Sequence, residues 1–405
     1  MADLPRGAAV IGQSGGPTAV INQSLVGVVR GLRRTLADAG AVDRVLGMRH
    51  GVRGLTEGSF VDLTGTTDDV LDRVAATPSA ALGSTRDKPD DAYCERIFRA
   101  CEQHGVRYFF YIGGNDSADT CRIVHERAQQ AGYELWCYHV PKTVDNDLPG
   151  NDHTPGFPSA ARYVAMAHMA DGMDNASLPG IKINVVMGRH AGFLTAAAAA
   201  ARWREGAGPH LVYVPEVPFE TDRFVDDVAR IFDEYGRCQI AVSEGIQDKE
   251  GTAIGAALVG GEKDAHGNVQ LSGSGALGDQ LADLLKARLA PQGGKPPRVR
   301  ADTFGYLQRC FPDPSPVDAD EARRVGESAA DLAADGKHGL SVTIERRPSA
   351  TYASAMGSQS LAAVAAQTRH LPAEFLDGHA NVSDAFMDYI RPLVGELPAF
   401  AGLDG

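Results

Sequence analysis

The sequence lacks the features that mark several large classes of protein. Its six cysteines are scattered over 405 residues without a C-x-x-C pair or a Cys/His cluster, so neither a zinc site nor a disulfide framework is indicated. Acidic residues outnumber basic ones by 52 to 39, and the net charge of −13 argues against nucleic acids or anionic membranes as partners. No apolar run reaches the ~18 residues of a membrane span, and the first residues do not resemble a signal peptide. We therefore expect a cytoplasmic protein with free thiols.

What the chain has in quantity is glycine, with 46 residues, and a regular alternation of strand and helix patterns. Apolar segments at 8–12 and 108–113 are each followed by a glycine-containing turn and a helical pattern, over 21–36 and 117–132. Such alternation is typical of a parallel sheet with crossover helices. It resumes after residue 157, and the chain is too long for one ordinary core. We therefore expect two Rossmann-like α/β domains with parallel-rich sheets.

Several elements of the second unit can be placed individually. We expect a helix over 158–175, an alanine-rich helix from residue 194, and a strand over 300–309. The last 60 residues show a mixed pattern that ends in a helix near SDAFMDYIRPLVG, at 383–395.

Polar, glycine-rich loops follow the predicted strands, at the sheet edge where parallel sheets bind ligands. GQSGGPT, at 12–18, would expose backbone N–H groups at a helix start, which suits an anion, although glycines needed only for packing would look the same. GGNDS, at 113–117, places a carboxylate beside such a loop. That combination suggests a divalent cation, unless Asn115 and Asp116 only cap the next helix.

The loop PKTVDNDLPG, at 141–150, combines a cation with carboxylates. Lys142 could neutralise a phosphate, and Asp145 and Asp147 could serve as a general base and as a contact to metal or water. A charged loop of this kind can also be merely solvated. Adjacent parallel strands would bring all three loops to one crevice, however, which favours a shared site.

Further candidate side chains sit after other predicted strands or in loops. They offer cations for phosphate, a carboxylate that could accept hydrogen bonds from hydroxyl groups, and a phenol. Together with the carboxylate base they indicate phosphoryl transfer to a sugar hydroxyl. These candidates are Arg86, Arg189, Glu216, Tyr306 and Arg309.

The ordered motifs of the chain resemble the 6-phosphofructokinase family over roughly residues 8–345. The motifs are SGGPTAVIN, IGGNDS, PKTVDND, NDHTPGF, MGRHAG, PEVPF and FGYLQR. The resemblance implies two α/β domains with the active site in the interdomain cleft. It implies a phosphoryl-donor (pyrophosphate and Mg²⁺) domain formed by 1–156 plus about 308–350. The sugar-phosphate-binding domain would be formed by 157–307 plus about 351–405.

The resemblance also implies catalytic roles for individual residues. Asp145 would take the proton from the 1-hydroxyl of fructose 6-phosphate, and Asp147 would support Asp145. Thr143 would position the hydroxyl and the phosphoryl group, and Arg189 would neutralise charge that develops on that group.

Substrate contacts follow from the same resemblance. The donor would be lined by Gly16 and Arg86, the sugar would be held by Met187, Gly188 and Glu216, and the 6-phosphate would be bound by Arg300, Tyr306 and Arg309. Arg300 would come from a neighbouring subunit, which implies a homodimer or homotetramer. Gly180 stands where a second arginine of the neighbour often binds the 6-phosphate, with Lys182 close by.

Two positions indicate the donor. ATP-using members of the family have Gly where this chain has Asp116 and Lys142. Asp116 would place a carboxylate where the α-phosphate of ATP lies, whereas Lys142 suits the free end of a short, highly charged donor. This pair is the mark of pyrophosphate-dependent members. Asn115 replaces the usual Asp for Mg²⁺, so we expect Mg²⁺ to be held mainly by Asp116 and pyrophosphate, with Asn115 touching it directly or through water.

We therefore expect reversible phosphoryl transfer from pyrophosphate to the 1-hydroxyl of fructose 6-phosphate, giving fructose 1,6-bisphosphate and phosphate in glycolysis and gluconeogenesis. The alternatives are an ATP-dependent 6-phosphofructokinase and a pyrophosphate-dependent kinase of another sugar phosphate, such as sedoheptulose 7-phosphate. A non-catalytic sugar-phosphate-binding paralogue is a third, but the presence of Asp145 and Arg189 argues against it. Val26 and Arg30 occupy the places of two effector-binding arginines of allosteric ATP-users, so that effector site is not expected.

Overall fold

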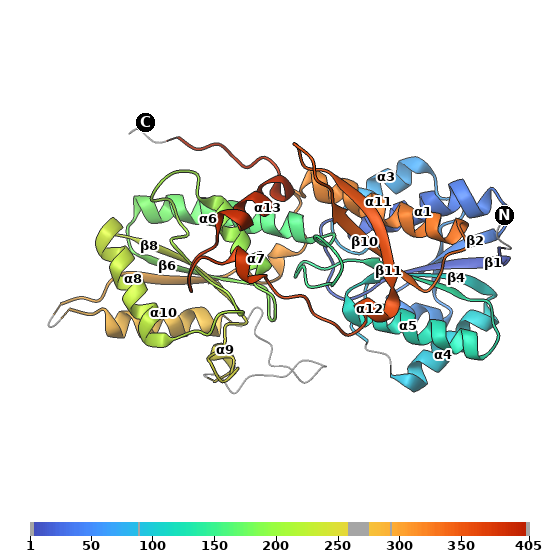
Figure 1. Cartoon of the computed structure of the whole chain (residues 1–405), viewed down its shortest axis with the longest axis horizontal. Helices are drawn as coiled ribbons and strands as arrows, with labels where there is room; N and C mark the ends of the chain where they lie inside the picture. The colour runs from blue at the N-terminus through green and yellow to red at the C-terminus, as the bar shows by residue number, and fades with distance from the viewer. Residues whose placement is uncertain (1–3, 88–89, 258–274, 292–293, 402–405) are drawn as a thin grey trace. The chain divides into compact units, whose positions relative to one another are not determined.

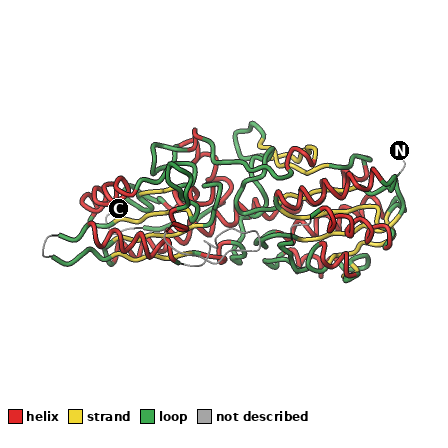
Figure 2. The backbone as a smooth tube through the Cα atoms, turned by 90° about the horizontal axis from the view of Figure 1, so that it is seen from below, coloured by secondary structure: helices red, strands yellow, loops and turns green. Residues whose placement is uncertain are grey.

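The computed structural model describes residues 4–87, 90–257, 275–291 and 294–401 (Figure 1). The chain divides into two compact units. The first unit contains Met1–Ser159 and Arg309–Arg369, and the second contains Ala160–Gln308 and His370–Gly405. In the described part of each unit, strands lie between layers of helices (Figure 2). None of the helices described combines the length and the apolar character that a membrane crossing requires.

The first unit is built on a seven-stranded sheet with the strand order β11-β10-β5-β4-β1-β2-β3. The central pairs are parallel, whereas β3 and β11 each add an antiparallel strand at an edge. The strands are β1 (Gly7–Gln13), β2 (Val42–Met48), β3 (Phe60–Asp62), β4 (Val106–Gly113), β5 (Trp136–Pro141), β10 (Leu340–Arg346) and β11 (Ser354–Ser360).

Helices cover both faces of this sheet, which explains why its central strands read as continuous apolar runs. Ala9 and Ile11 of β1 pack on one face with α1 and α11, and Ala8 and Val10 pack on the other with α4 and α5 (Figure 1). The helices are α1 (Ile21–Leu32), the π-helical turn η1 (Arg33–Ala37), α2 (Val52–Glu57), α3 (Asp68–Ala75), α4 (Asp91–Gln103), α5 (Asn115–Gln130), α11 (Pro316–Ala334) and α12 (Leu361–Val364).

The second unit has a four-stranded parallel sheet with the order β7-β8-β6-β9. Helices α8 and α10 pack on one face, while Asp171 of α6 bonds to Asn184 of β6 and Gln239 of β8 from the other. The strands are β6 (Ile181–Val186), β7 (Leu211–Tyr213), β8 (Cys238–Ser243) and β9 (Val299–Thr303). The helices are α6 (Phe157–Ser177), α7 (Phe193–Ala196), η2 (Ala197–Ala201), α8 (Thr221–Tyr235), α9 (Ile254–Ala257), α10 (Ala276–Arg288), η3 (Gly305–Gln308), η4 (Ala373–Phe375) and α13 (Asp384–Val394).

The predicted fold class is confirmed, but several boundaries were wrong. The strand expected over 300–309 ends at Thr303, and a 3₁₀ turn, η3, follows. The alanine-rich helix is a single α-helical turn continued by the 3₁₀ segment η2. Residues 351–369, expected in the sugar-phosphate-binding domain, pack in the first unit, because β11 pairs along its whole length with β10.

Candidate active site

Three loops of the first unit leave the carboxyl ends of neighbouring strands. In the parallel sheet Gln13 of β1 pairs with Ile112 of β4, and Gly113 pairs with Pro141 of β5. The loops also bond to one another, because the Lys142 backbone N–H donates to the Gly113 carbonyl over 2.9 Å. The hydroxyls of Ser14 and Ser117 form a further bond between the first loop and α5. The order of the strands therefore gathers the GQSGGPT, GGNDS and PKTVDND segments at one edge.

Lys142 lies at the centre of this edge and is 3% exposed. Its Nζ donates to the Gly16 carbonyl over 2.9 Å. Burial and the charge of Arg309 lower the pKa of Lys142 to about 7, partly offset by Asp145 and Asp147. At neutral pH the charged form of Lys142 is therefore only weakly favoured over the neutral form when no anion is bound.

The glycines of the first loop make room for the side chains of Lys142 and Arg309. A Cβ on Gly15, whose φ is +73°, would lie 3.0 Å from Lys142 Nζ, and a Cβ on Gly16 would lie 2.9 Å from Arg309 Cζ. Arg86 is exposed on a loop held against the same segment, since Gly15 N donates to Thr85 O over 2.8 Å. The glycine loop is thus lined by positive charge within the first unit.

The carboxylates lie on a loop with a fixed backbone. Asp145 N donates to the Thr143 hydroxyl over 3.1 Å, and Asn146 adopts a left-handed φ of 59° with its side chain buried. Burial, followed by the charge of Asp145, raises the pKa of Asp147 to about 7. At neutral pH the carboxyl group of Asp147 is therefore protonated for part of the time.

The start of α5 differs from what we expected. The helix begins at Asn115 rather than near Ser117, Gly114 is its N-cap, and no side chain caps it. Asn115 Oδ1 instead accepts the Asp116 N–H over 2.9 Å, and its Nδ2 donates to Gln367 O over 3.3 Å. The exposed Asp116 stands in the first turn, where a negative charge is favoured by the helix dipole.

In the second unit the predicted MGR segment follows β6. Met187 N donates to Gln308 Oε1 over 3.2 Å, and Gly188, with φ of +130°, accepts from the Ser243 hydroxyl over 2.6 Å. A Cβ on Gly245 would lie 2.0 Å from Arg189 O, so the loops after β6 and β8 are in close contact. The strand ends of this unit therefore also gather candidate residues.

Glu216 is used in a way that the sequence did not indicate. Its Oε1 accepts the backbone N–H groups of Gly192, over 2.9 Å, and Leu371, over 2.8 Å, and burial raises the pKa of its carboxyl. The other oxygen of the Glu216 carboxylate, Oε2, has no hydrogen-bond partner among the described residues. Glu244, which sequence reasoning did not select, is 6% exposed and directly follows β8 in the segment QIAVSEG. The rule that selected the other loops, a polar residue after a strand, would have found it.

The remaining predicted residues are more exposed. Arg300 lies on β9, and its side chain donates to the backbone carbonyl of the preceding residue, Val299, over 3.0 Å. Tyr306 of η3 is 48% exposed. Lys182 is not available as a substitute for an arginine at position 180, because its Nζ lies 2.8 Å from Asp171 and 3.2 Å from Asp174. Within the described residues no group of three or more His, Cys, Asp or Glu side chains could hold a metal ion.

Comparison with known proteins decides between the families that this chemistry would suit. Residues 8–333 match the family model described as phosphofructokinase. The chain belongs to this family. It is therefore a phosphotransferase.

Individual relatives of this phosphofructokinase are similar over almost their whole length. The pyrophosphate–fructose 6-phosphate 1-phosphotransferase of Rhodospirillum rubrum is 52% identical, over 96% of this chain and 95% of that protein. The enzyme of the same name from Halomonas elongata is 37% identical, over 94% of this chain and 90% of that protein. A crystal structure of pyrophosphate-dependent phosphofructokinase from Marinobacter aquaeolei has a TM-score of 0.83 and 33% identity. It covers 98% of this chain and 94% of that chain.

Proposed function

We propose that this phosphofructokinase reversibly transfers a phosphoryl group from pyrophosphate to the 1-hydroxyl of fructose 6-phosphate. The products are fructose 1,6-bisphosphate and inorganic phosphate. The observation that carries the proposal is the buried ammonium of Lys142, bonded to the Gly16 carbonyl at the strand ends of the first unit. The names of the relatives from R. rubrum and H. elongata support it.

The donor assignment rests on two charges. An ammonium fixed beside the glycine loop would neutralise the end of a short donor, and binding an anion there would favour the charged form of Lys142. Asp116, in the first turn of α5, would oppose the α-phosphate of a nucleotide. Gly16, Arg86 and Arg309 would complete the anion-binding surface of the first unit.

Acceptor activation is assigned to the PKTVDND loop. Asp145 would accept the proton of the 1-hydroxyl as its oxygen attacks phosphorus, and the P–O bond to the leaving phosphate would break. Asp147, whose pKa is about 7, would keep the local charge low enough for a phosphate to approach. Thr143, which already holds Asp145 N, would position the acceptor and the phosphoryl group.

Mg²⁺ is part of the proposal. Proteins usually hold it through one or two carboxylates and the substrate's own phosphates, so the single exposed carboxylate of Asp116 fits this mode. Asn115 would contribute only the remaining lone pair of Oδ1, since this oxygen accepts the Asp116 N–H. When bound, the ion would offset the negative charge of the phosphates.

The acceptor side is assigned to residues of the second unit together with Arg309. Arg189 would neutralise charge on the transferred group, and Met187, Gly188 and the free Oε2 of Glu216 would hold the sugar, to which we add Glu244. The 6-phosphate would be bound by Tyr306, Arg309 and Arg300, with Arg300 supplied by the neighbouring subunit of a homodimer or homotetramer. We place the enzyme in the cytoplasm, in glycolysis and gluconeogenesis.

The test is an initial-rate assay of the purified enzyme with Mg²⁺ and either pyrophosphate or ATP. Fructose 6-phosphate and sedoheptulose 7-phosphate are compared as acceptors. We expect the highest kcat/KM with pyrophosphate and fructose 6-phosphate. A higher value with ATP would refute the donor assignment, and a higher value with the longer sugar would refute the acceptor.

A further inference from the structure

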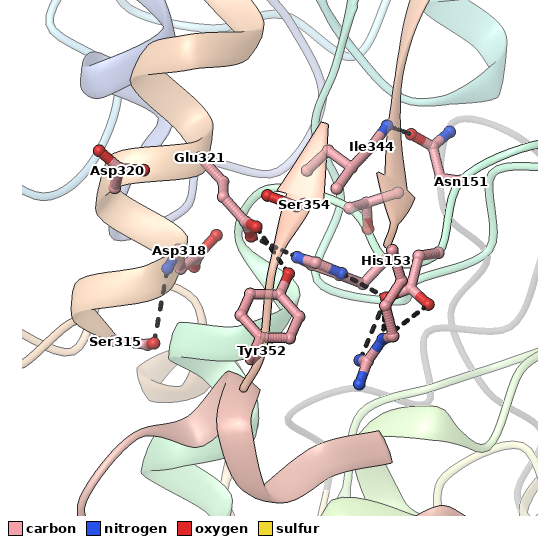
Figure 3. Close-up of polar contacts among 12 residues, drawn as sticks. Asn151, His153, Ser315, Asp318, Asp320, Glu321, Ile344, Tyr352 and Ser354 are labelled. Carbon is pink, nitrogen blue, oxygen red and sulfur yellow. Dashed lines mark hydrogen bonds and ion pairs between the residues drawn. The ribbon is translucent and has the colours of Figure 1, made fainter. Parts of the chain in front are cut away.

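A buried cluster of charges lies next to the PKTVDND loop in the first unit. The side chain of His153 is 1% exposed, and each of its ring nitrogens faces a carboxylate. Nδ1 lies 2.8 Å from Asp152 Oδ2, and Nε2 lies 2.6 Å from Glu321 Oε2 of α11. Figure 3 shows the imidazole with Glu321 and Tyr352 on one side. With both carboxyl groups ionised, both nitrogens donate, and the ring is an imidazolium.

The outer partners of this cluster balance its charge. Tyr352 donates its hydroxyl to Glu321 Oε1 over 2.6 Å, and Arg346 of β10 donates to both oxygens of Asp152 over 3.1 and 3.2 Å. Glu321 is 2% exposed, so its charge has almost no access to water. Two carboxylates, one guanidinium and one imidazolium sum to zero. With a neutral ring the cluster would bury a net negative charge, which is costly.

The cluster is connected to the catalytic loop through the residues that follow His153. Thr154 N donates to Asn146 Oδ1 over 3.0 Å, and its hydroxyl donates to Thr143 O over 2.8 Å. Thr143 N in turn donates to Pro155 O over 3.1 Å. The residues on either side of the Val144–Asp145 pair are therefore both fixed by the segment that His153 anchors.

The other end of this segment is fixed to the sheet. Asp152 N donates to Ile344 O of β10 over 2.8 Å. Asn151 Oδ1 accepts from Ile344 N over 3.0 Å, as Figure 3 shows. His153 lies between this anchor and Thr154. Its side chain connects the segment to α11 through the hydrogen bond to Glu321. A loss of its charge would therefore act first on Thr154 and then on Asp145.

We propose that His153 is a positioning residue whose positive charge, held between Asp152 and Glu321, sets the place of Asp145 during phosphoryl transfer. The proposal rests on the assignment of Asp145 as the base. The groups that face His153 or its segment come from several elements. They are Asp152 on its own segment, Glu321 and Asp318 of α11, Arg346 of β10, Tyr352, and Arg369, which donates to the carbonyls of Asn151 and Asp152.

The pH dependence follows from the same contacts. Although burial opposes it, bonding to the two carboxylates raises the pKa of His153 to about 9. The ring is therefore charged at neutral pH, and kcat should fall as the pH rises through about 9. A raised pKa in the folded state also stabilises the protein most below the unfolded value of about 6.5, and this contribution is lost between that pH and about 9.

The experiment compares His153→Gln with the double variant His153→Gln/Glu321→Gln, which removes one charge of each sign. Tyr352→Phe serves as the control, because it removes a neutral hydroxyl and keeps both charges. We expect His153→Gln to lower kcat on the order of tenfold or more, with KM for both substrates nearly unchanged and without the alkaline fall of kcat. The double variant should recover part of the kcat that His153→Gln loses, and the Tyr352→Phe control should keep most of the wild-type kcat.

A folded His153→Gln enzyme with the kcat and pH profile of the wild type would overturn the proposal. If this variant does not fold, ¹⁵N NMR of histidine-labelled wild-type protein decides, since the proposal requires both ring nitrogens of His153 to be protonated at pH 7 and a neutral tautomer would refute it. Rates are measured with whichever donor the wild type prefers. A preference for ATP would thus contradict the proposed function without affecting the test of His153.

Discussion

At the scale of single residues, the chemistry of the first unit depends on charges that are held out of water. Lys142 and Asp147 both have a pKa of about 7, one lowered and the other raised mainly by burial. Their charges therefore change over the same pH range and respond to the arrival of an anion. An exposed lysine and aspartate at the same positions in the sequence would have no such property.

This environment predicts the pH dependence of pyrophosphate capture. In the free enzyme Lys142 loses its proton as the pH rises through about 7, so kcat/KM for pyrophosphate should fall above that pH. Lys142→Arg keeps the positive charge to high pH, and the fall should then disappear even if the absolute rate is lower. Identical profiles for the two enzymes would show that Lys142 does not control donor binding.

Residue-scale reasoning from sequence succeeded where a side chain follows a strand and failed where its partner is distant. The pattern of strands and glycines was enough to place Lys142 and Asp145 at one sheet edge. It could not indicate that His153 lies between two carboxyl groups, because its partner Glu321 is 168 positions away. Nor could it indicate that two backbone N–H groups, those of Gly192 and Leu371, occupy Oε1 of Glu216.

At the scale of elements, glycine decides how closely helices approach. Gly326 of α11 faces α1, and a Cβ there would lie 2.2 Å from Ser24 O. The backbone of α1 cannot yield locally, since α1 is packed against β1 and β4 in the core of the first unit.

Gly326→Ala should therefore destabilise the protein, although alanine is the better helix former. We expect a loss of about 1–3 kcal/mol in the free energy of unfolding, typical of overpacking. Urea unfolding measures it, with Ser328→Ala on the same helix as the control for helix propensity. A gain in stability for Gly326→Ala would mean that the two helices are not in contact at this point.

Strands could be predicted from the sequence where one or both of their faces are apolar. The buried strands β1, β4 and β5 follow from their apolar runs. The edge strand β11, with the sequence SAMGSQS, is partly exposed along its length and carries no apolar alternation, so only its pairing with β10 reveals it. The same pairing explains why the chain leaves the first unit at Arg369 rather than near residue 350.

At the scale of the whole molecule, the proposed binding of the 6-phosphate involves a second chain. If Arg300 binds the 6-phosphate of the neighbouring subunit, then Arg300→Ala should raise KM for fructose 6-phosphate on the order of tenfold or more, because a hydrogen bond between charged groups is lost. KM for pyrophosphate should change little.

Mixing two variants that are both impaired at low fructose 6-phosphate tests the origin of Arg300 directly. Asp145→Asn protein still carries Arg300, and Arg300→Ala protein still carries the base. Subunits of the two kinds, unfolded and refolded together, should regain part of the activity at low fructose 6-phosphate. An absence of recovery, with hybrid oligomers demonstrated by native mass spectrometry, would show that Arg300 serves its own subunit.

In the proposed function, Asp116 and Lys142 make pyrophosphate the donor. The most direct measurement is kcat/KM for pyrophosphate and for ATP, with fructose 6-phosphate and Mg²⁺, in the wild type and in the double variant Asp116→Gly/Lys142→Gly. We expect that the wild type prefers pyrophosphate, and that the double variant loses much of this activity while its ratio shifts toward ATP. A wild type that prefers ATP, or a double variant with an unchanged ratio, would contradict it.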